Sequence, residues 1–188
     1  MKEISFITGN KSKFKEAEEI MKEINVKLTQ EDLKFNEVRS TDQEKVVIEK
    51  ARNAFNALKK PVITDDTAIY FSAYNKFPGT YTNYVFESLG FEGILRLLKG
   101  KSRKAYFKTI LCYKDKKTEK IFSGIWEGTI SPNVKGNFNP DWQYNGIFVP
   151  KGSKKFLSQI SIEERAKNSH RKKAFNKLIK ELKGGNLK

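Results

Sequence analysis

The stretch Pro61-Val-Ile-Thr-Asp-Asp-Thr-Ala-Ile-Tyr-Phe71 is the part of the sequence on which the predicted fold depends. A short β-type run, Val62-Ile-Thr64, leads into two carboxylates, Asp65 and Asp66. Acidic residues directly after a buried strand lie at the carboxyl edge of a sheet, where open α/β folds hold ligands. Carboxylate oxygens suit Mg²⁺, which keeps several waters for phosphate substrates. An isolated pair of this kind is also typical of a strand-to-turn junction, because aspartate is a common turn residue.

Toward the N-terminus, the pattern alternates between strands and helices. Residues 2–8 and 26–29 are predicted strands, and residues 11–24 form a predicted helix with one apolar face. Overlapping capping boxes in Ser40-Thr-Asp-Gln-Glu44 open a second helix, which continues to about Leu58. The central stretch then follows as the third strand.

Toward the C-terminus, helices, a hairpin and a final helix follow. In chain order we predict short helices at 81–89 and 93–98 divided by Gly90, strands at 104–113 and 121–130, a loop at 133–143, a strand at 144–149, and a closing helix from the capping box Ser161-Ile-Glu-Glu164 to about Leu182. The order of these elements predicts an α/β fold with a mixed sheet.

The composition is that of an ordinary soluble globular chain. With 188 residues, 38% hydrophobic and 31% charged, the chain fits one domain. No apolar run approaches the ~20 residues of a transmembrane helix, and the first residues lack the apolar core of a signal peptide. The single cysteine, Cys112, excludes an internal disulfide framework and agrees with a reducing cytoplasm.

The formal net charge is +15, which attracts polyanions. Nucleic acid, an anionic membrane surface and nucleoside triphosphates all meet that description, and charge by itself does not choose among them. The lysines are spread through the chain, so no block is a basic disordered arm.

The segment Thr8-Gly-Asn-Lys-Ser-Lys13 lies between the first strand and the first helix. Backbone N–H groups and the dipole at a helix N-terminus favour an anion. Gly9 permits close approach of the backbone, Thr8 and Asn10 can donate hydrogen bonds, and Lys13 adds a positive charge. The segment is not a Walker A loop. It predicts phosphate binding, with an ordinary strand–helix turn as the competing interpretation.

Two further signals are weak when each is considered by itself. Glu37 precedes the helix that carries Lys50, and a single loop glutamate is usually solvent-facing. Ser169-His-Arg171 contains the only histidine, and a lone histidine is more often structural than catalytic. Its neighbouring guanidinium offers planar, multidentate recognition that lysine does not.

Five motifs together resemble the inosine triphosphate pyrophosphatase family, and its archaeal members most of all. In chain order they are Thr8-Gly-Asn-x-x-Lys13, Asp65-Asp-Thr67, Phe77-Pro-Gly-Thr-Tyr81, Arg103-Lys-Ala-Tyr-Phe-Lys-Thr109 and Ser169-His-Arg171. The resemblance extends from about Ile4 to Leu182. It implies an elongated mixed β-sheet flanked by helices, with two lobes around a central nucleotide-binding cleft, in one domain of residues 1–188.

The resemblance also implies an activity. ITP, dITP or XTP would be cleaved between the α- and β-phosphates to the monophosphate and pyrophosphate, with Mg²⁺ as cofactor. The enzyme would be a cytoplasmic homodimer without nucleic-acid or membrane partners. Asp66 matches a metal ligand that also orients or deprotonates the attacking water, and Glu37 and Asp65 are the further metal-binding carboxylates. The substrate-binding residues implied are Thr8, Asn10, Lys13, Lys50, Trp142, Tyr144, Asn145, Arg165, Ser169, His170 and Arg171.

The choice of base would come from polar matching. A hypoxanthine or xanthine ring presents an acceptor at position 6, whereas adenine presents an amino donor. Fixed donors from Arg171 and its neighbours would meet the keto oxygen and oppose the amine, and matching of this kind discriminates by roughly 10⁴.

The chain departs from the pattern of the family it resembles before the last predicted strand. Where the family reads Gly-Phe-Gly-(Tyr or Trp)-Asp-Pro-Ile-Phe, this chain has Asp141-Trp-Gln-Tyr-Asn-Gly-Ile-Phe148. Trp142 keeps an aromatic for the base, but Asn145 replaces an aspartate and loses its charge. Arg165 stands in place of a family lysine. A pyrophosphatase with a shifted base preference, or a nucleic-acid-binding protein on the same scaffold, therefore stays open as an alternative.

Overall fold

The computed structural model describes residues 2–35, 38–136, 140–185 and 187, with residues 140–142 as backbone only. It contains a single mixed sheet in which the strand order is β2-β1-β3-β5-β6-β7, with β4 paired to β3. The neighbours β2, β1 and β3 are parallel, and the other pairs are antiparallel. The strands are β1 (Lys2–Ile7), β2 (Val26–Glu31), β3 (Val62–Phe71), β4 (Pro78–Gly79), β5 (Lys104–Lys114), β6 (Glu119–Ile130) and β7 (Phe148–Pro150). The predicted α/β fold with a mixed sheet is confirmed.

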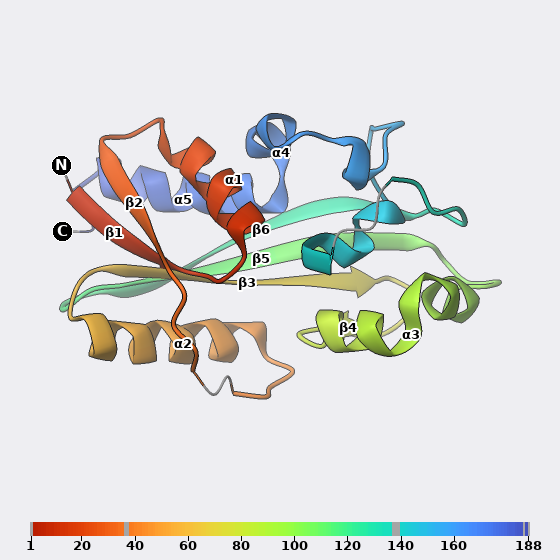
Figure 1. Cartoon of the computed structure of the whole chain (residues 1–188), viewed down its shortest axis with the longest axis horizontal. Helices are drawn as coiled ribbons and strands as arrows, with labels where there is room; N and C mark the ends of the chain where they lie inside the picture. Colours follow the sequence, from red (N-terminus) through yellow and green to blue (C-terminus); the bar gives the residue numbers. More distant parts are fainter. Residues whose placement is uncertain (1, 36–37, 137–139, 186, 188) are drawn as a thin grey trace.

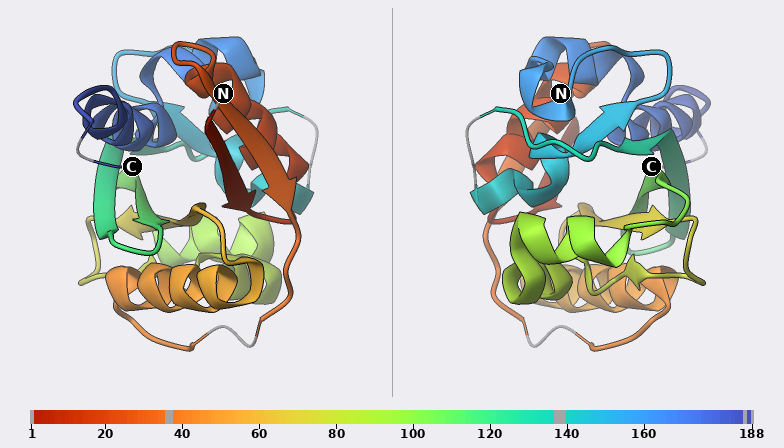
Figure 2. Two further views of the ribbon diagram at one scale, coloured as in Figure 1. Left: turned by 90° about the vertical axis from the view of Figure 1, so that its left-hand side faces the viewer. Right: turned by 90° about the vertical axis from the view of Figure 1, so that its right-hand side faces the viewer.

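Helices cover both faces of this curled sheet (Figures 1 and 2). Helices α1 (Lys11–Met21), α4 (Ile162–Asn168) and α5 (His170–Lys183) lie on one face, and α2 (Gln43–Leu58) lies on the other. At the far end of the sheet are α3 (Thr82–Leu97) and two 3₁₀ helices, η1 (Pro140–Gly146) and η2 (Leu157–Gln159). None of the helices in the described ranges has the length and apolar character needed to cross a bilayer.

The prediction that the strand ends before Asp65 and Asp66 is wrong. Strand β3 continues through both carboxylates to Phe71, because β5 pairs with it along its whole length. Its other edge behaves differently: β1 pairs with it only as far as Thr64, and β4 pairs from Ile69. Between these points β5 is the only described strand that pairs with β3, so the two carboxylates lie beside an open edge of the sheet.

The predicted strand at 144–149 is confirmed only at its last two residues. Residues 140–146 form η1, and β7 begins only at Phe148. The buried ring of Tyr144 packs edge-on against Phe71 and Phe86, with centroids 6.1 and 5.2 Å apart. Its hydroxyl donates to the Thr82 carbonyl over 2.9 Å. Tyr144 is therefore held by side-chain packing against β3 and α3, and not by strand pairing within the sheet.

Helix boundaries differ from prediction mainly at polar caps. Asp42, and not Ser40 or Thr41, caps α2, since its Oδ1 accepts from the Glu44 N–H at 2.9 Å. The closing helix is divided at Ser169, which ends α4 and caps α5. The Ser161 capping box is confirmed, as is the break at Gly90, which has φ of 58°.

Two large hydrophobic clusters share the sheet. The first lies between β1, β3 and β5 on one side and α1 and α5 on the other, and includes the edge-to-face pair Phe6–Phe175 with centroids 5.9 Å apart. The second surrounds Phe71, Phe107 and Phe148 beneath α3 and η1. The sheet therefore connects two separately packed regions, which correspond to the two expected lobes.

Phe175→Ala should lower the free energy of unfolding by about 3–5 kcal/mol, because it opens a cavity beside Phe6 in the first cluster. Urea denaturation would measure the loss. Ile125→Ala removes a side chain that is 43% exposed and should change stability by less than about 0.5 kcal/mol. Equal effects from the two substitutions would contradict this description of the core.

Candidate active site

A cavity of about 390 Å³ opens beside the unpaired edge of β3. Its lining comes from both lobes: the first turn of α1, the middle of β3, β5 and β6, the start of α3, η1, and the junction of α4 and α5. Of the residues that the sequence predicted for the site, those lining it are Asn10, Lys13, Lys50, Asp65, Asp66, Tyr144, Asn145, Arg165, Ser169, His170 and Arg171. Glu37 and the side chain of Trp142 lie outside the described residues.

The predicted phosphate loop is built as a capped helix start. Asn10 caps α1, and its Oδ1 accepts from the Lys13 N–H at 2.9 Å. The Asn10 N–H donates to Thr8 Oγ1 over 3.2 Å. Thr8 lies not in the main cavity but in an adjoining hollow of about 260 Å³, and Lys50 lines both. A side chain at Gly9 would begin 2.8 Å from Asp32 Oδ1, so glycine fits the close approach there.

Asp65 and Asp66 face opposite sides of the sheet, because successive side chains of a strand alternate. Asp65 is buried on the side of α1 and α5. It accepts from Lys13 Nζ at 3.2 Å and from Arg171 Nη2 at 3.3 Å. Burial opposes its ionisation, but the charges of Lys13 and Arg171 outweigh this and hold the pKa of Asp65 well below its usual range. Asp65 is therefore ionised and forms ion pairs with both Lys13 and Arg171.

Asp66 is the freer of the two carboxylates. Its Oδ2 is buried without a hydrogen-bond partner in the described part of the chain. Burial raises the pKa of Asp66 to about 6, and repulsion from Asp65 adds to this while Lys13 opposes it. A buried carboxylate oxygen without a donor is chemically suited to a hard cation such as Mg²⁺. Within the described ranges no three His, Cys, Asp or Glu side chains converge on a metal site. The Asp65 oxygens accept from Lys13, Arg171 and Thr67, whereas Asp66 Oδ2 is left for such a cation.

Glu16 is a site residue that the sequence reasoning missed. It is 3% exposed on α1 and lines the cavity. Its carboxylate accepts from Ser169 Oγ at 2.5 Å and from Arg171 Nη1 at 2.6 Å. The available signal was its position: Glu16 lies one turn after Lys13 and four residues before Ile20, on the buried face of the helix.

Arg171 is almost fully committed to protein partners. Nη1 binds Glu16, and Nη2 binds Asp65 and, over 3.1 Å, Thr67 Oγ1. Its Nε is buried without a partner among the described residues. We predicted that Arg171 presents several donors to a base. Among the described residues, only its Nε–H is left without a partner and could fill that role.

His170 forms part of an aromatic wall of the cavity. Its ring stacks on Phe107, with centroids 5.1 Å apart and planes at 17°, and lies 6.1 Å from Trp126. Burial, with the Arg171 charge beside it, lowers the pKa of His170 well below its ordinary value, so the ring is neutral. Gly124 on β6 makes the arrangement possible, because a side chain there would begin 2.1 Å from the His170 carbonyl oxygen.

The remaining predicted side chains differ in how they are held. Arg165 is buried and donates to the carbonyls of Ile160 at 3.0 Å and Leu157 at 2.5 Å. Burial lowers the pKa of Arg165 to about 10, so it stays charged at neutral pH. Asn145 is buried on η1 beside Gln143, whose Oε1 has no partner within the described chain. Arg165 thus anchors η2 to α4, while η1 turns amide groups toward the cavity.

A model of the Ham1 family matches residues 4–181 of the sequence. The chain belongs to the Ham1 family. It is 38% identical over 180 residues to the dITP/XTP pyrophosphatase of Saccharolobus solfataricus, covering 95% of this chain and 93% of that protein. It is 36% identical over 178 residues to the inosine triphosphate pyrophosphatase of Yarrowia lipolytica, covering 93% of each.

A solved structure supports the same assignment. The Ham1 protein of Staphylococcus aureus superposes with a TM-score of 0.81 at 26% identity, over 98% of this chain and 100% of that one. The resemblance inferred from five short motifs therefore holds along almost the whole chain.

Asp66→Asn should stabilise this Ham1 protein by about 1–3 kcal/mol at pH 8 in EDTA. The folded-state pKa of Asp66, about 6, lies above its ordinary value of 3.8, so ionisation favours the unfolded state. Wild-type stability is therefore lost relative to the variant as the pH rises from about 4 through 6, and the difference disappears near pH 4. Urea denaturation at several pH values measures it; a variant less stable than wild type at pH 8 would contradict the prediction.

Proposed function

We propose that this Ham1 protein hydrolyses ITP, dITP and XTP to the nucleoside monophosphate and pyrophosphate, and so removes deaminated purines from the nucleotide pool. The observation that carries the proposal is that one cavity joins two unlike regions. One contains the α1 N-terminus with Lys13 and Lys50, and the other contains the neutral, stacked His170 beside Arg171. The names of the relatives, dITP/XTP and inosine triphosphate pyrophosphatase, agree with such a substrate.

The triphosphate would lie against the first region. Lys13 and Lys50 line the cavity, and backbone N–H groups at the capped start of α1 favour an anion. Attack by water on the α-phosphorus would break its bond to the bridging oxygen, with pyrophosphate leaving. The charges that neutralise the phosphates are fixed in place before reaction, which is the main electrostatic contribution a protein makes to such a step.

In this proposal Asp66 and Glu37 would hold Mg²⁺, and Asp65, on the opposite face of β3, would support the site through its ion pairs. When bound, Mg²⁺ would neutralise phosphate charge and acidify a water molecule. Asp66 itself, ionised above its pKa of about 6, can orient the attacking water and accept a proton from it at Oδ2. Asp65, committed to Lys13 and Arg171, would contribute more to holding that geometry than to proton transfer.

The purine would lie against the second region. The His170 ring with Phe107 and Trp126 offers an apolar wall, and the unpartnered Arg171 Nε–H offers a donor to a keto oxygen at position 6. An adenine amino group would leave that donor unpaired. We propose that Ser169 acts by fixing the motif, since its hydroxyl binds Glu16. Tyr144, Asn145 and Trp142 on η1 would complete the base site, with Thr8 and Asn10 shaping the phosphate loop.

The substrate assay is direct. With Mg²⁺, ITP, dITP and XTP should release pyrophosphate at a kcat/KM at least about 10²-fold above that of ATP, because the 6-amino group of adenine leaves the buried Arg171 donor unpaired. Asp66→Asn should reduce turnover by about 10³-fold or more while the protein stays folded. The absence of turnover on ITP, dITP and XTP would contradict the proposal.

A nucleic-acid-binding protein on the same scaffold is the second candidate, favoured by the net charge of +15. It would bind DNA or RNA with an affinity that falls steeply with salt, and it would be indifferent to Asp66→Asn. The same variant therefore separates the two functions.

We also propose that residues 1–188 form one two-lobed domain that works as a homodimer in the cytoplasm. Exposed aromatic side chains at the start of α3 support association: Tyr81 is 41% exposed and Tyr84 is 68% exposed. The single cysteine, Cys112, is buried and unpaired, which agrees with a reducing compartment.

Light scattering should give a mass near twice the 21.7 kDa of one chain. Substituting both Tyr81 and Tyr84 with serine should shift the protein toward the monomer, because the substitutions remove exposed apolar surface. A wild-type mass of one chain at micromolar concentration would rule out the dimer.

A further inference from the structure

We propose that Gln43 is a positioning residue for Asp66: its side-chain amide bridges two strands at the level of the catalytic carboxylate and fixes the Asp66 peptide against α2. The inference rests on the proposed function. Gln43 is the first residue of α2 and is 3% exposed. The sequence predicts Gln43 only as part of the capping boxes in Ser40-Thr-Asp-Gln-Glu44, and it is not among the proposed substrate contacts.

Both polar atoms of the Gln43 side chain have hydrogen-bond partners. Nε2 donates to the Asp66 carbonyl and to the Lys108 carbonyl, each over 3.1 Å. Oε1 accepts from the Tyr70 hydroxyl at 3.2 Å. The two carbonyls can only accept hydrogen bonds, so the amide nitrogen must face them and the amide oxygen must face Tyr70.

Tyr70 holds the other side of the amide. Its ring stacks on Tyr106 of the neighbouring strand, with centroids 5.0 Å apart and planes at 13°. Burial raises the pKa of Tyr70 to about 12, so its hydroxyl keeps the proton that Gln43 accepts. A stacked, protonated phenol on one side and two carbonyls on the other leave the amide a single orientation.

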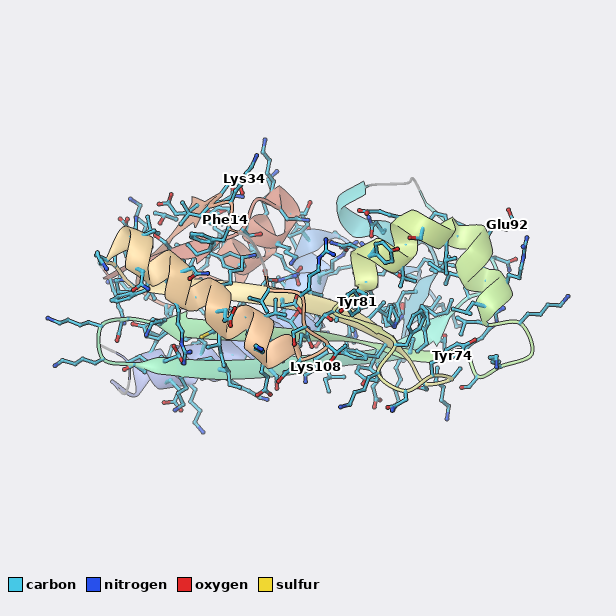
Figure 3. All side chains as sticks on the ribbon, turned by 90° about the horizontal axis from the view of Figure 1, so that it is seen from below. Phe14, Lys34, Tyr74, Tyr81, Glu92 and Lys108 are labelled. Carbon is cyan, nitrogen blue, oxygen red and sulfur yellow. The ribbon has the colours of Figure 1, made fainter. Side chains whose placement is uncertain are left out.

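The hydrogen bonds of Gln43 matter because of where they lie on β3. Between Thr64 and Ile69, β5 is the only described strand that pairs with β3. Gln43 bridges β3 to β5 within that interval and joins both to the N-terminal end of α2, where Figure 3 shows Lys108. Helix α2 also carries Lys50, so the bridge sets the carboxylate and this lysine in one frame on the cavity wall.

A second buried hydrogen bond between the same two elements provides a matched control. Thr64 Oγ1 donates to the Val47 carbonyl of α2 over 2.9 Å. It also lies on the α2 face of β3, but it does not contact the Asp66 peptide. Thr64→Val keeps the side-chain shape and removes only this bond, whereas Gln43→Leu removes the bridge.

The test measures pyrophosphate release from ITP with Mg²⁺ by wild type, Gln43→Leu, Tyr70→Phe and Thr64→Val, with thermal unfolding of each. We expect kcat to fall about tenfold in Gln43→Leu, with KM within twofold, because a small displacement of a reacting group costs rate more than binding. Tyr70→Phe should lose about threefold by the same mechanism. Thr64→Val should lower the unfolding temperature as Gln43→Leu does, and keep kcat within twofold.

A kcat within twofold of wild type in both Gln43→Leu and Tyr70→Phe would overturn the inference, as would an equal loss in Thr64→Val. Should Gln43→Leu fail to fold, Tyr70→Phe decides, because it removes one hydroxyl from a half-buried ring. A wild-type enzyme silent on ITP would overturn the proposed function and this inference together. An active wild type with unaffected variants would overturn only the role of Gln43.

Discussion

The site depends on one buried guanidinium held between two carboxylates. Arg171 comes from α5, Glu16 from α1 and Asp65 from β3, and the three side chains are almost fully removed from solvent. Both carboxylates are tolerated because Arg171 lies against each of them and Lys13 Nζ, 3.2 Å from Asp65, supplies the second positive charge. Removing one partner from such a cluster typically costs about 3–5 kcal/mol. The cluster therefore ties together the first turns of α1, the central strand β3 and the start of α5. The same side chains that line the cavity therefore also hold α1, α5 and β3 together.

The difference between the two neighbouring aspartates follows from this cluster and from the pleat of β3. Asp65 points to the charged side and stays ionised, with its pKa held low by Lys13 and Arg171. Asp66 points to the other side, where burial raises its pKa to about 6. Two carboxylates with pKa values pushed apart are a recurring feature of sites that need one fixed anion and one group that exchanges protons or binds metal. The early end of β1 exposes both to the same cavity.

The His170 side of the cavity relies on packing more than on charge. Gly124 lets the first turn of α5 lie against β6, so that His170 can stack on Phe107. The neutral His170 ring, and an Arg171 side chain bound to Glu16, Asp65 and Thr67, leave few free polar groups there. Asn145 and Gln143 on η1 are where this chain departs from its family, and they add amide groups to the same wall.

Features that depend on neighbouring residues could be predicted from the sequence alone. Strand and helix order, the break at Gly9-Asn10 before α1, the Ser161 capping box and the family all follow from patterns within a few residues of one another. Distances across the chain could not be read. Asp65–Asp66 has the local signature of a turn, yet β5 extends the strand because ten residues of pairing outweigh a local preference. The sequence gives Glu16 only a position on an apolar helix face, gives Gln43 only a place in a capping box, and gives Gly124 no signal. Their roles exist only because tertiary packing brings α1 to α5, α2 to β3 and α5 to β6, and burial then makes each of their contacts costly to lose.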